Sequence, residues 1–202
     1  MRFIHASDLH IDSPLRGLDR YDGAPVERLR SATRSALERL VDKALAERVD
    51  FLLLAGDIYD RDWQDFHTGL FFRGQMVRLE RAGIRCFIVQ GNHDAQGVIS
   101  RQLTLPSNVT VFSSRAAQTV KLDDLSVAIH GRSFPEREVN EDLVPSYPPP
   151  VSGYFNIGLL HTSLTGRAGH DTYAPTDLPT LVAKGYDYWA LGHVHAREVL
   201  NE

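Results

Sequence analysis

The chain has 202 residues, of which 43% are hydrophobic, and a formal net charge of −4. This length favours a single domain with one substantial core, and no apolar run reaches the roughly 18 residues of a membrane-spanning helix. The negative charge excludes a protein-wide attraction to nucleic acid, so any such contact has to be local. The single cysteine, Cys86, excludes an internal disulfide framework, and no secretory pattern opens the chain, so we expect a cytoplasmic protein without membrane contact.

The first half of the chain predicts three strands separated by two helices. The strands are the apolar runs at residues 2–6, 50–56 and 85–91. They lack alternation, which is typical of strands covered on both faces. Apolar residues at helical spacing predict one helix over 25–49, with Pro25 in its first turn, and another over 66–82 that stops at Gly83. This order requires right-handed crossovers and an at least partly parallel sheet between helices.

The second half predicts a further set of strands and one short helix. The apolar runs are those at residues 125–131, 155–161 and 188–193. Residues 108–112 and 118–131 have the pattern of antiparallel strands, with Asp123 and Asp124 at a turn. A helix over 178–184 should end at Gly185. We therefore expect the α/β class, as a layered αββα sandwich with mixed sheets.

Residues 134–153 contain five prolines and several charged side chains. Backbone this rich in proline pairs poorly inside a sheet. We interpret the segment as a long surface loop.

Five of the apolar runs end in side chains that can bind a metal ion. The candidate ligands are Asp8, His10, Asp57, Asn92, His161, His193 and His195. Ligands meet at the carboxyl ends of strands in open α/β sheets, so we expect the five endings to converge on one sheet. Seven ligands are too many for one ion, and a nitrogen and oxygen set without thiolate indicates two catalytic ions. Two ions about 3.5–4 Å apart can clamp a phosphate, and Asp57 can offer one oxygen to each.

Other polar and aromatic residues have simpler interpretations. Histidines outside these endings are expected in the core or on the surface: His5, His67, His130 and His170. Loop arginines that could touch phosphate are more often solvated: Arg101, Arg132 and Arg167. Tyr59 and Trp63 could stack on a base, but packing is the more common role.

Five short motifs resemble the blocks of calcineurin-like metallophosphoesterases. In chain order they are SDLH, GDIYD, GNHD, HTS and GHVH, and they span nearly the whole sequence from Asp8 to His195. The sequence around the motifs is similar to that of SbcD-type bacterial DNA repair exonucleases, especially the YhaO-like branch. The similar stretches are FIHASDLHI, LLHTSLTG and GYDYWALGHVH.

The resemblance implies a role for each motif residue. Asp8, His10 and His195 would hold one ion, Asn92, His161 and His193 the other, and Asp57 would bridge them. The ions would be two divalent metals, with manganese preferred by the family. His93 would contact the phosphate and protonate the leaving oxygen, and Asp94 would orient His93. The implied reaction is in-line attack on phosphorus by a metal-bridging hydroxide.

Two departures limit the resemblance. Some relatives have a histidine three positions beyond the bridging aspartate, implicated in exonuclease action, where this chain has Asp60. The sequence also stops seven residues after His195, whereas family members continue. We expect residues 1–202 to be a catalytic domain without its C-terminal strands and capping region.

The leading hypothesis is a manganese-dependent phosphodiesterase that acts on DNA ends as a repair exonuclease. The resemblance further implies a dimer and an SMC-like ATPase partner. Two alternatives stay open: a phosphoesterase for nucleotides or other small esters, and a noncatalytic metal-binding scaffold of the same fold. Cleavage polarity and endonuclease capacity are not predicted.

Overall fold

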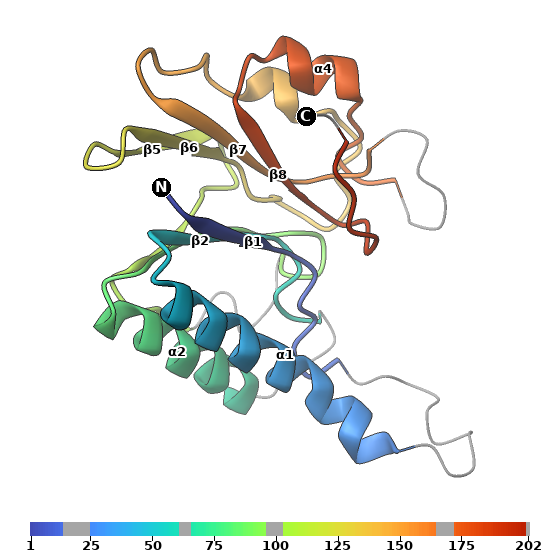
Figure 1. Ribbon diagram of the computed structural model, residues 1–202. Coiled ribbons are helices and arrows are strands. Elements are labelled where there is room, and N and C mark those ends of the chain that lie inside the picture. The colour runs from blue at the N-terminus through green and yellow to red at the C-terminus, as the bar shows by residue number, and fades with distance from the viewer. Residues whose placement is uncertain (14–24, 61–65, 96–102, 165–171, 201–202) are drawn as a thin grey trace.

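Two four-stranded sheets lie face to face, and helices cover the outer face of each, as Figure 1 shows. The layer order is therefore helix, sheet, sheet, helix, which confirms the predicted αββα class. The computed structural model describes residues 1–13, 25–60, 66–95, 103–164 and 172–200. In that part of the chain, no helix combines the length and the apolar character that crossing a membrane requires.

The first sheet is entirely parallel. Its strands, in spatial order, are β1 (Phe3–Ala6), β2 (Phe51–Ala55), β3 (Arg85–Val89) and β4 (Val109–Val111). The prediction that residues 108–112 form an antiparallel strand was wrong. The chain leaves the end of β3 and returns to its beginning, where the Cys86 amide donates to the Asn108 carbonyl at 2.9 Å. The connection between the strands is long enough for this parallel return.

Two long helices connect the first three strands and cover the outer face of this sheet (Figure 1). They are α1 (Val26–Glu47), between β1 and β2, and α2 (Phe66–Arg81), between β2 and β3. Both lie within two residues of their predicted ends. The helix α2 is followed by Gly83 with φ of 73°, a left-handed conformation that glycine adopts without strain.

The second sheet is mixed. Its strands, in spatial order, are β5 (Gln118–Leu122), β6 (Val127–Gly131), β7 (Phe155–His161) and β8 (Tyr188–Gly192). The strands β5 and β6 form the predicted antiparallel hairpin, with the two aspartates in its turn. The strands β6, β7 and β8 are parallel neighbours, so β7 and β8 end at the same edge.

Alternation along β2 shows how the core is divided. Leu52 and Leu54 pack toward α1 and α2, whereas Phe51 and Leu53 pack between the two sheets. Successive strand side chains point to opposite faces, so a strand buried on both faces is apolar throughout. Each fully buried side chain of this size contributes about 1.5–3 kcal/mol relative to exposure.

The segment 134–153 is not the simple surface loop that its prolines suggest. It includes a short 3₁₀ helix, η2 (Val144–Ser146), and its apolar residues cover the outer face of the second sheet together with α4 (Leu178–Ala183). Leu143 and Tyr147, for example, are buried in one cluster with Leu160 of β7. The prolines exclude sheet pairing, but they leave the intervening apolar side chains free to pack.

Candidate metal centre

The seven candidate ligands come together at the seam between the two sheets. They follow β1, β2 and β3 of the first sheet and end or follow β7 and β8 of the second. The expectation that all five strand endings belong to one sheet was therefore wrong. The two sheets pack with these carboxyl ends at a common edge, so the endings still converge.

The loops after β1 and β2 run side by side beyond the strands. The Asp8 amide donates to the Gly56 carbonyl and the His10 amide to the Asp57 carbonyl, both at 3.0 Å. An isolated parallel bridge between Ile11 and Tyr59 continues the pairing. The two loops are thus aligned by backbone hydrogen bonds, which fixes where their side chains emerge.

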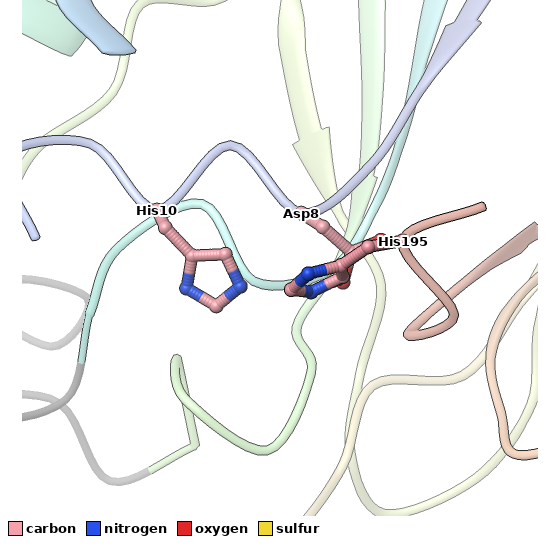
Figure 2. Close-up of side chains that lie close together, drawn as sticks. All are labelled: Asp8, His10 and His195. Carbon is pink, nitrogen blue, oxygen red and sulfur yellow. The ribbon is translucent and has the colours of Figure 1, made fainter. Parts of the chain in front are cut away.

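Asp8, His10 and His195 form a first group, shown in Figure 2. One potential ligand atom from each lies within 4.8 Å of the others. The His195 Nε2 atom is 3.7 Å from Asp8 Oδ1, and the His195 side chain is 56% exposed. His10 Nε2 is buried and has no hydrogen-bond partner among the described residues. A buried imidazole nitrogen that lies beside carboxylates without a hydrogen bond fits a metal ligand.

A second group consists of Asp57, His161 and His193, again with ligand atoms within 4.8 Å. All three residues are buried. His161 directs Nε2 toward Asn92 Oδ1 at 3.0 Å, while its Nδ1 lies 2.8 Å from the Ala55 carbonyl oxygen. That carbonyl accepts the Nδ1 proton and so leaves Nε2 for a ligand or a proton.

Asp57 belongs to the second group and also faces the first. Its Oδ2 atom is 3.4 Å from His161 Nε2 and 3.9 Å from His10 Nε2, while its Oδ1 accepts a hydrogen bond from the His93 amide at 2.9 Å. Burial opposes ionisation of Asp57, but the neighbouring His161 outweighs it and lowers the Asp57 pKa to about 2. The carboxylate is therefore charged and available to both groups.

Backbone strain is concentrated in this cluster. Asp8, His10, Asp57 and His193 all have positive φ, with His193 at 95°. Such conformations cost of order 1–3 kcal/mol each and persist where the surroundings enforce them. For His193 the enforcing contact is visible, because its amide donates to both carboxylate oxygens of Asp8 at 3.0 and 3.1 Å.

Glycines allow the backbones to approach closely here. A Cβ atom on Gly192, at the end of β8, would collide with the Ala55 carbonyl oxygen of β2. A Cβ atom on Gly91 would collide with the Asp57 carboxylate. Only glycine permits these contacts between elements that carry the ligands.

His93 has a different partner from the one expected. Its Nδ1 atom lies 3.1 Å from Asp60 Oδ1, whereas Asp94 accepts hydrogen bonds from the amides of Ile58, Tyr59 and Gly91. The prediction that Asp94 orients His93 is thus corrected: Asp60 is the partner of the His93 ring, and Asp94 joins the loops after β2 and β3. Burial raises the pKa of Asp94 to about 7, and the nearby Asp57 charge adds to the rise.

Asp60 was singled out in the sequence only as a departure, and its contacts give it a place in the site. Burial would raise the Asp60 pKa, but hydrogen bonds from Ser13 and the adjacent His93 hold it below the ordinary value. Ser13 was not predicted at all. No pattern in the sequence marks it, and in the structure it lies two residues beyond Ile11, where the pairing of the loops ends.

The remaining candidates are mostly structural. His130 is buried between Thr119 and Asn156, and Tyr59 packs against Phe72 with ring centroids 5.7 Å apart. Arg132 is not solvated as expected, because it donates to Ser146 Oγ at 3.0 Å and its side chain is 15% exposed. The two ring nitrogens of His5 lie next to the Tyr188 hydroxyl and the Leu191 carbonyl oxygen, and His67 is an exposed residue of α2. Four further candidates lie outside the described residues: Trp63, Arg101, Arg167 and His170.

Comparison with known proteins agrees with this architecture. A family model described as calcineurin-like phosphoesterase matches residues 1–197. The chain is 37% identical over 204 residues to the uncharacterized metallophosphoesterase YhaO of Bacillus subtilis (strain 168), a match that covers 100% of this chain and 50% of that protein.

More distant relatives carry nuclease and repair names. The chain is 25% identical over 212 residues to the DNA double-strand break repair protein Mre11 of Methanopyrus kandleri, covering 96% of this chain and 44% of that protein. It is 28% identical over 117 residues to a subunit of the nuclease SbcCD of Escherichia coli (strain K12), covering 56% of this chain and 27% of that subunit. The chain thus spans half or less of the length of these relatives. With the motif residues gathered at one edge and nearly the whole length matched, the chain belongs to the calcineurin-like phosphoesterase family.

Proposed function

We propose that this chain is a metal-dependent phosphodiesterase that hydrolyses DNA phosphodiester bonds, as the nuclease part of a DNA repair exonuclease. The observation that carries the proposal is the position of Asp57, whose one carboxylate faces His161 of one group and His10 of the other. Two groups that share a carboxylate suit two neighbouring ions and a bound phosphate. The names of the Mre11 and SbcCD relatives support DNA as the substrate.

In this proposal each group holds one divalent ion. Asp8, His10 and His195 would hold the first ion, Asn92, His161 and His193 would hold the second, and Asp57 would contribute to both. The donor set is oxygen and imidazole without thiolate, which suits manganese. Bound ions of this kind supply hydroxide near neutral pH and offset negative charge on the phosphate.

His93 acts on the leaving group. Its Nδ1 is directed at Asp60, which leaves Nε2 as the atom that can give a proton to the substrate. As the nucleophile adds to phosphorus and the bond to the sugar oxygen breaks, that oxygen takes the His93 proton. The Asp60 carboxylate holds the His93 ring in this orientation, and the buried Asp94 keeps the loop of His93 against the loop of Asp57.

The rest of the assembly is also part of the proposal. Residues 1–202 form the catalytic domain in this proposal, and they match about half the length of the YhaO and Mre11 relatives. One relative is by name a part of SbcCD, which supports a second component, of the SMC-like ATPase type. A homodimer and a cytoplasmic location complete the proposed setting.

One observation favours a smaller substrate as the second candidate. The segment after Phe134, whose ring lies 5.6 Å from that of His161, carries three exposed glutamates. They are Glu136, Glu138 and Glu141. Negative charge in this segment disfavours a long polyanion more strongly than a small phosphate ester, which carries fewer charges. A noncatalytic scaffold would retain the fold and hydrolyse neither.

The test is a manganese-supplemented nuclease assay on duplex DNA labelled at either end, with wild type and His93→Ala in parallel. The proposal predicts degradation of the duplex faster than turnover of small phosphate esters, and loss of the DNA activity by about 10²-fold or more in His93→Ala. Faster turnover of the small esters would establish the second candidate instead. No hydrolysis of either substrate by the manganese-loaded protein would leave only the scaffold.

A further inference from the structure

A chain of hydrogen bonds leads from His93 through Asp60 to the loop after β1. Asp60 Oδ1 pairs with His93 Nδ1 at 3.1 Å, and Asp60 Oδ2 accepts a hydrogen bond from Ser13 Oγ at 2.7 Å. The two carboxylate oxygens are therefore used by two different partners. A carboxylate held at both oxygens cannot rotate about its terminal bond without losing one of these bonds.

Ser13 is itself fixed by its neighbours. Its amide donates to the His10 carbonyl at 3.0 Å, which closes a turn whose third residue, Asp12, has φ of 58°. Aspartate tolerates this left-handed conformation better than most residues. The turn places the Ser13 hydroxyl beside Asp60, two residues beyond Ile11, at which the two loops stop pairing.

The neighbouring residue, Asp12, anchors the turn to both long helices. Arg34 of α1 donates to the Asp12 carboxylate through Nε at 2.7 Å and Nη2 at 2.5 Å, and Thr68 Oγ1 of α2 donates to Asp12 Oδ2 at 2.5 Å. The Asp12 amide donates to Thr33 Oγ1 at 3.1 Å. Bidentate arginine pairing of this kind is geometrically restrictive.

These contacts link the helical layer to the residue proposed to protonate the leaving group. We propose that Ser13 is a positioning residue, which holds the Asp60 carboxylate in the orientation that keeps His93 directed at the leaving oxygen. The inference rests on the proposed phosphodiesterase function and adds to it a residue that touches neither phosphate nor ion. Asp12, Arg34 and Thr68 fix the turn from which Ser13 acts.

The proposal makes a prediction that depends on the leaving group. Nitrophenolate leaves without a proton, so bis(4-nitrophenyl) phosphate does not require His93 to be aligned, whereas the sugar oxygen of thymidylyl-thymidine does. Ser13→Ala should lower kcat on thymidylyl-thymidine about tenfold, the effect typical of residues that orient an active-site side chain through a hydrogen bond. On the nitrophenyl ester, the same substitution should lower kcat less than about twofold. Ser13→Thr retains the hydroxyl and should restore wild-type turnover of both.

Two further measurements complete the experiment. Ser31→Ala is the matched control, because Ser31 is an exposed α1 residue whose hydroxyl donates only to the Arg28 carbonyl among the contacts described, and it should behave as wild type. Nitrogen-15 NMR of the metal-free protein detects the hydrogen bond at His93 Nδ1 independently of activity. The hydrogen-bonded Nδ1 proton of His93 should be observed in wild type and Ser13→Thr and exchange away in Ser13→Ala.

The outcomes separate the two proposals. Equal losses of Ser13→Ala on both substrates, or no loss on either with an unchanged NMR signal, would overturn the positioning role while the phosphodiesterase function stands. If the wild type with bound manganese hydrolyses neither substrate, the proposed function fails and the role of Ser13 fails with it.

Discussion

The two sheets contribute different chemistry to the metal centre. The loops of the first sheet supply both carboxylates and the amide, Asp8, Asp57 and Asn92, whereas the second sheet supplies only imidazoles. Those imidazoles are His161, His193 and His195. The two groups proposed to hold ions each include residues from both sheets, whereas a third cluster of His10, Asp60 and His93 lies entirely on loops of the first sheet. Both carboxylates of the two proposed ion-binding groups thus come from the first sheet and most of their imidazoles from the second, so each proposed ion would depend on both sheets.

The largest expected effect follows from removing the carboxylate that both groups share. Asp57→Asn keeps the shape but removes the charge, and we expect both manganese sites to be lost and hydrolysis to fall by more than the roughly 100-fold typical of supporting residues. Calorimetric manganese titration and an activity assay measure the two effects. Asp42→Asn, an exposed carboxylate paired with Arg78 on the helical layer, is the control and should change neither. Retention of two tight sites in Asp57→Asn would contradict the shared role.

Metal binding should also stabilise the fold, because its ligands join the two sheets. At manganese concentrations of 100 times Kd, each ion adds about 2.7 kcal/mol to the free energy of unfolding. For a chain of this size that corresponds to a rise in Tm of roughly 2–4 °C per kcal/mol. Thermal denaturation with manganese and with a chelator gives the difference, and Asp57→Asn should show none. An equal shift in both proteins would mean that the metal acts elsewhere.

A contact between the sheets can be broken without touching a ligand. Gly192→Ala places a Cβ atom against the Ala55 carbonyl and forces β8 away from β2, at a cost of about 1–3 kcal/mol in unfolding free energy. Manganese affinity should fall with it, since His193 moves with β8. The matched change is Gly74→Ala in α2, where a Cβ meets nothing within 4 Å and helix stability rises by about 0.5–1 kcal/mol. Normal manganese affinity in Gly192→Ala would argue against a site at the seam.

The smallest predicted difference compares two histidines of the second sheet. His161→Ala removes a buried ring and leaves the Ala55 carbonyl without its donor, so the metal-free protein should lose about 1–3 kcal/mol. His195 is largely exposed, and His195→Ala should change the stability of the metal-free protein by less than about 0.5 kcal/mol. Each variant should also lower the affinity for one of the two manganese ions. Chemical denaturation with chelator present measures the free energies of unfolding. Similar decreases in both variants would contradict the buried position of His161 and the exposed position of His195.

Much of the fold was predictable because periodicity is local. The helices ended where glycine or a break in apolar spacing indicated, and strands buried on both faces were apolar throughout, as β2 illustrates. The direction of β4 was not predictable, since it depends on the path of a long connection. The packing of residues 134–153 was missed for a related reason: proline excludes sheet pairing but does not decide which apolar side chains find a surface.

Like the fold, the candidate site was predictable from the sequence only in part. Its seven candidate metal ligands could be selected from strand endings, because loops at the carboxyl ends of strands meet. The partner of His93 could not be selected in this way. Asp94 is adjacent in sequence, yet backbone amides capture its carboxylate, while Asp60 reaches His93 from another loop. Such pairings depend on how two loops align, which spacing alone does not encode.

The most direct test of the proposed two-ion centre is the anomalous scattering of manganese in crystals of the protein soaked with that ion. We predict two peaks about 3.5–4 Å apart, one beside Asp8, His10 and His195, the other beside Asn92, His161 and His193, with Asp57 in contact with both. A single peak remote from Asp57, or no peak at saturating manganese, would contradict a two-ion centre built across the sheets.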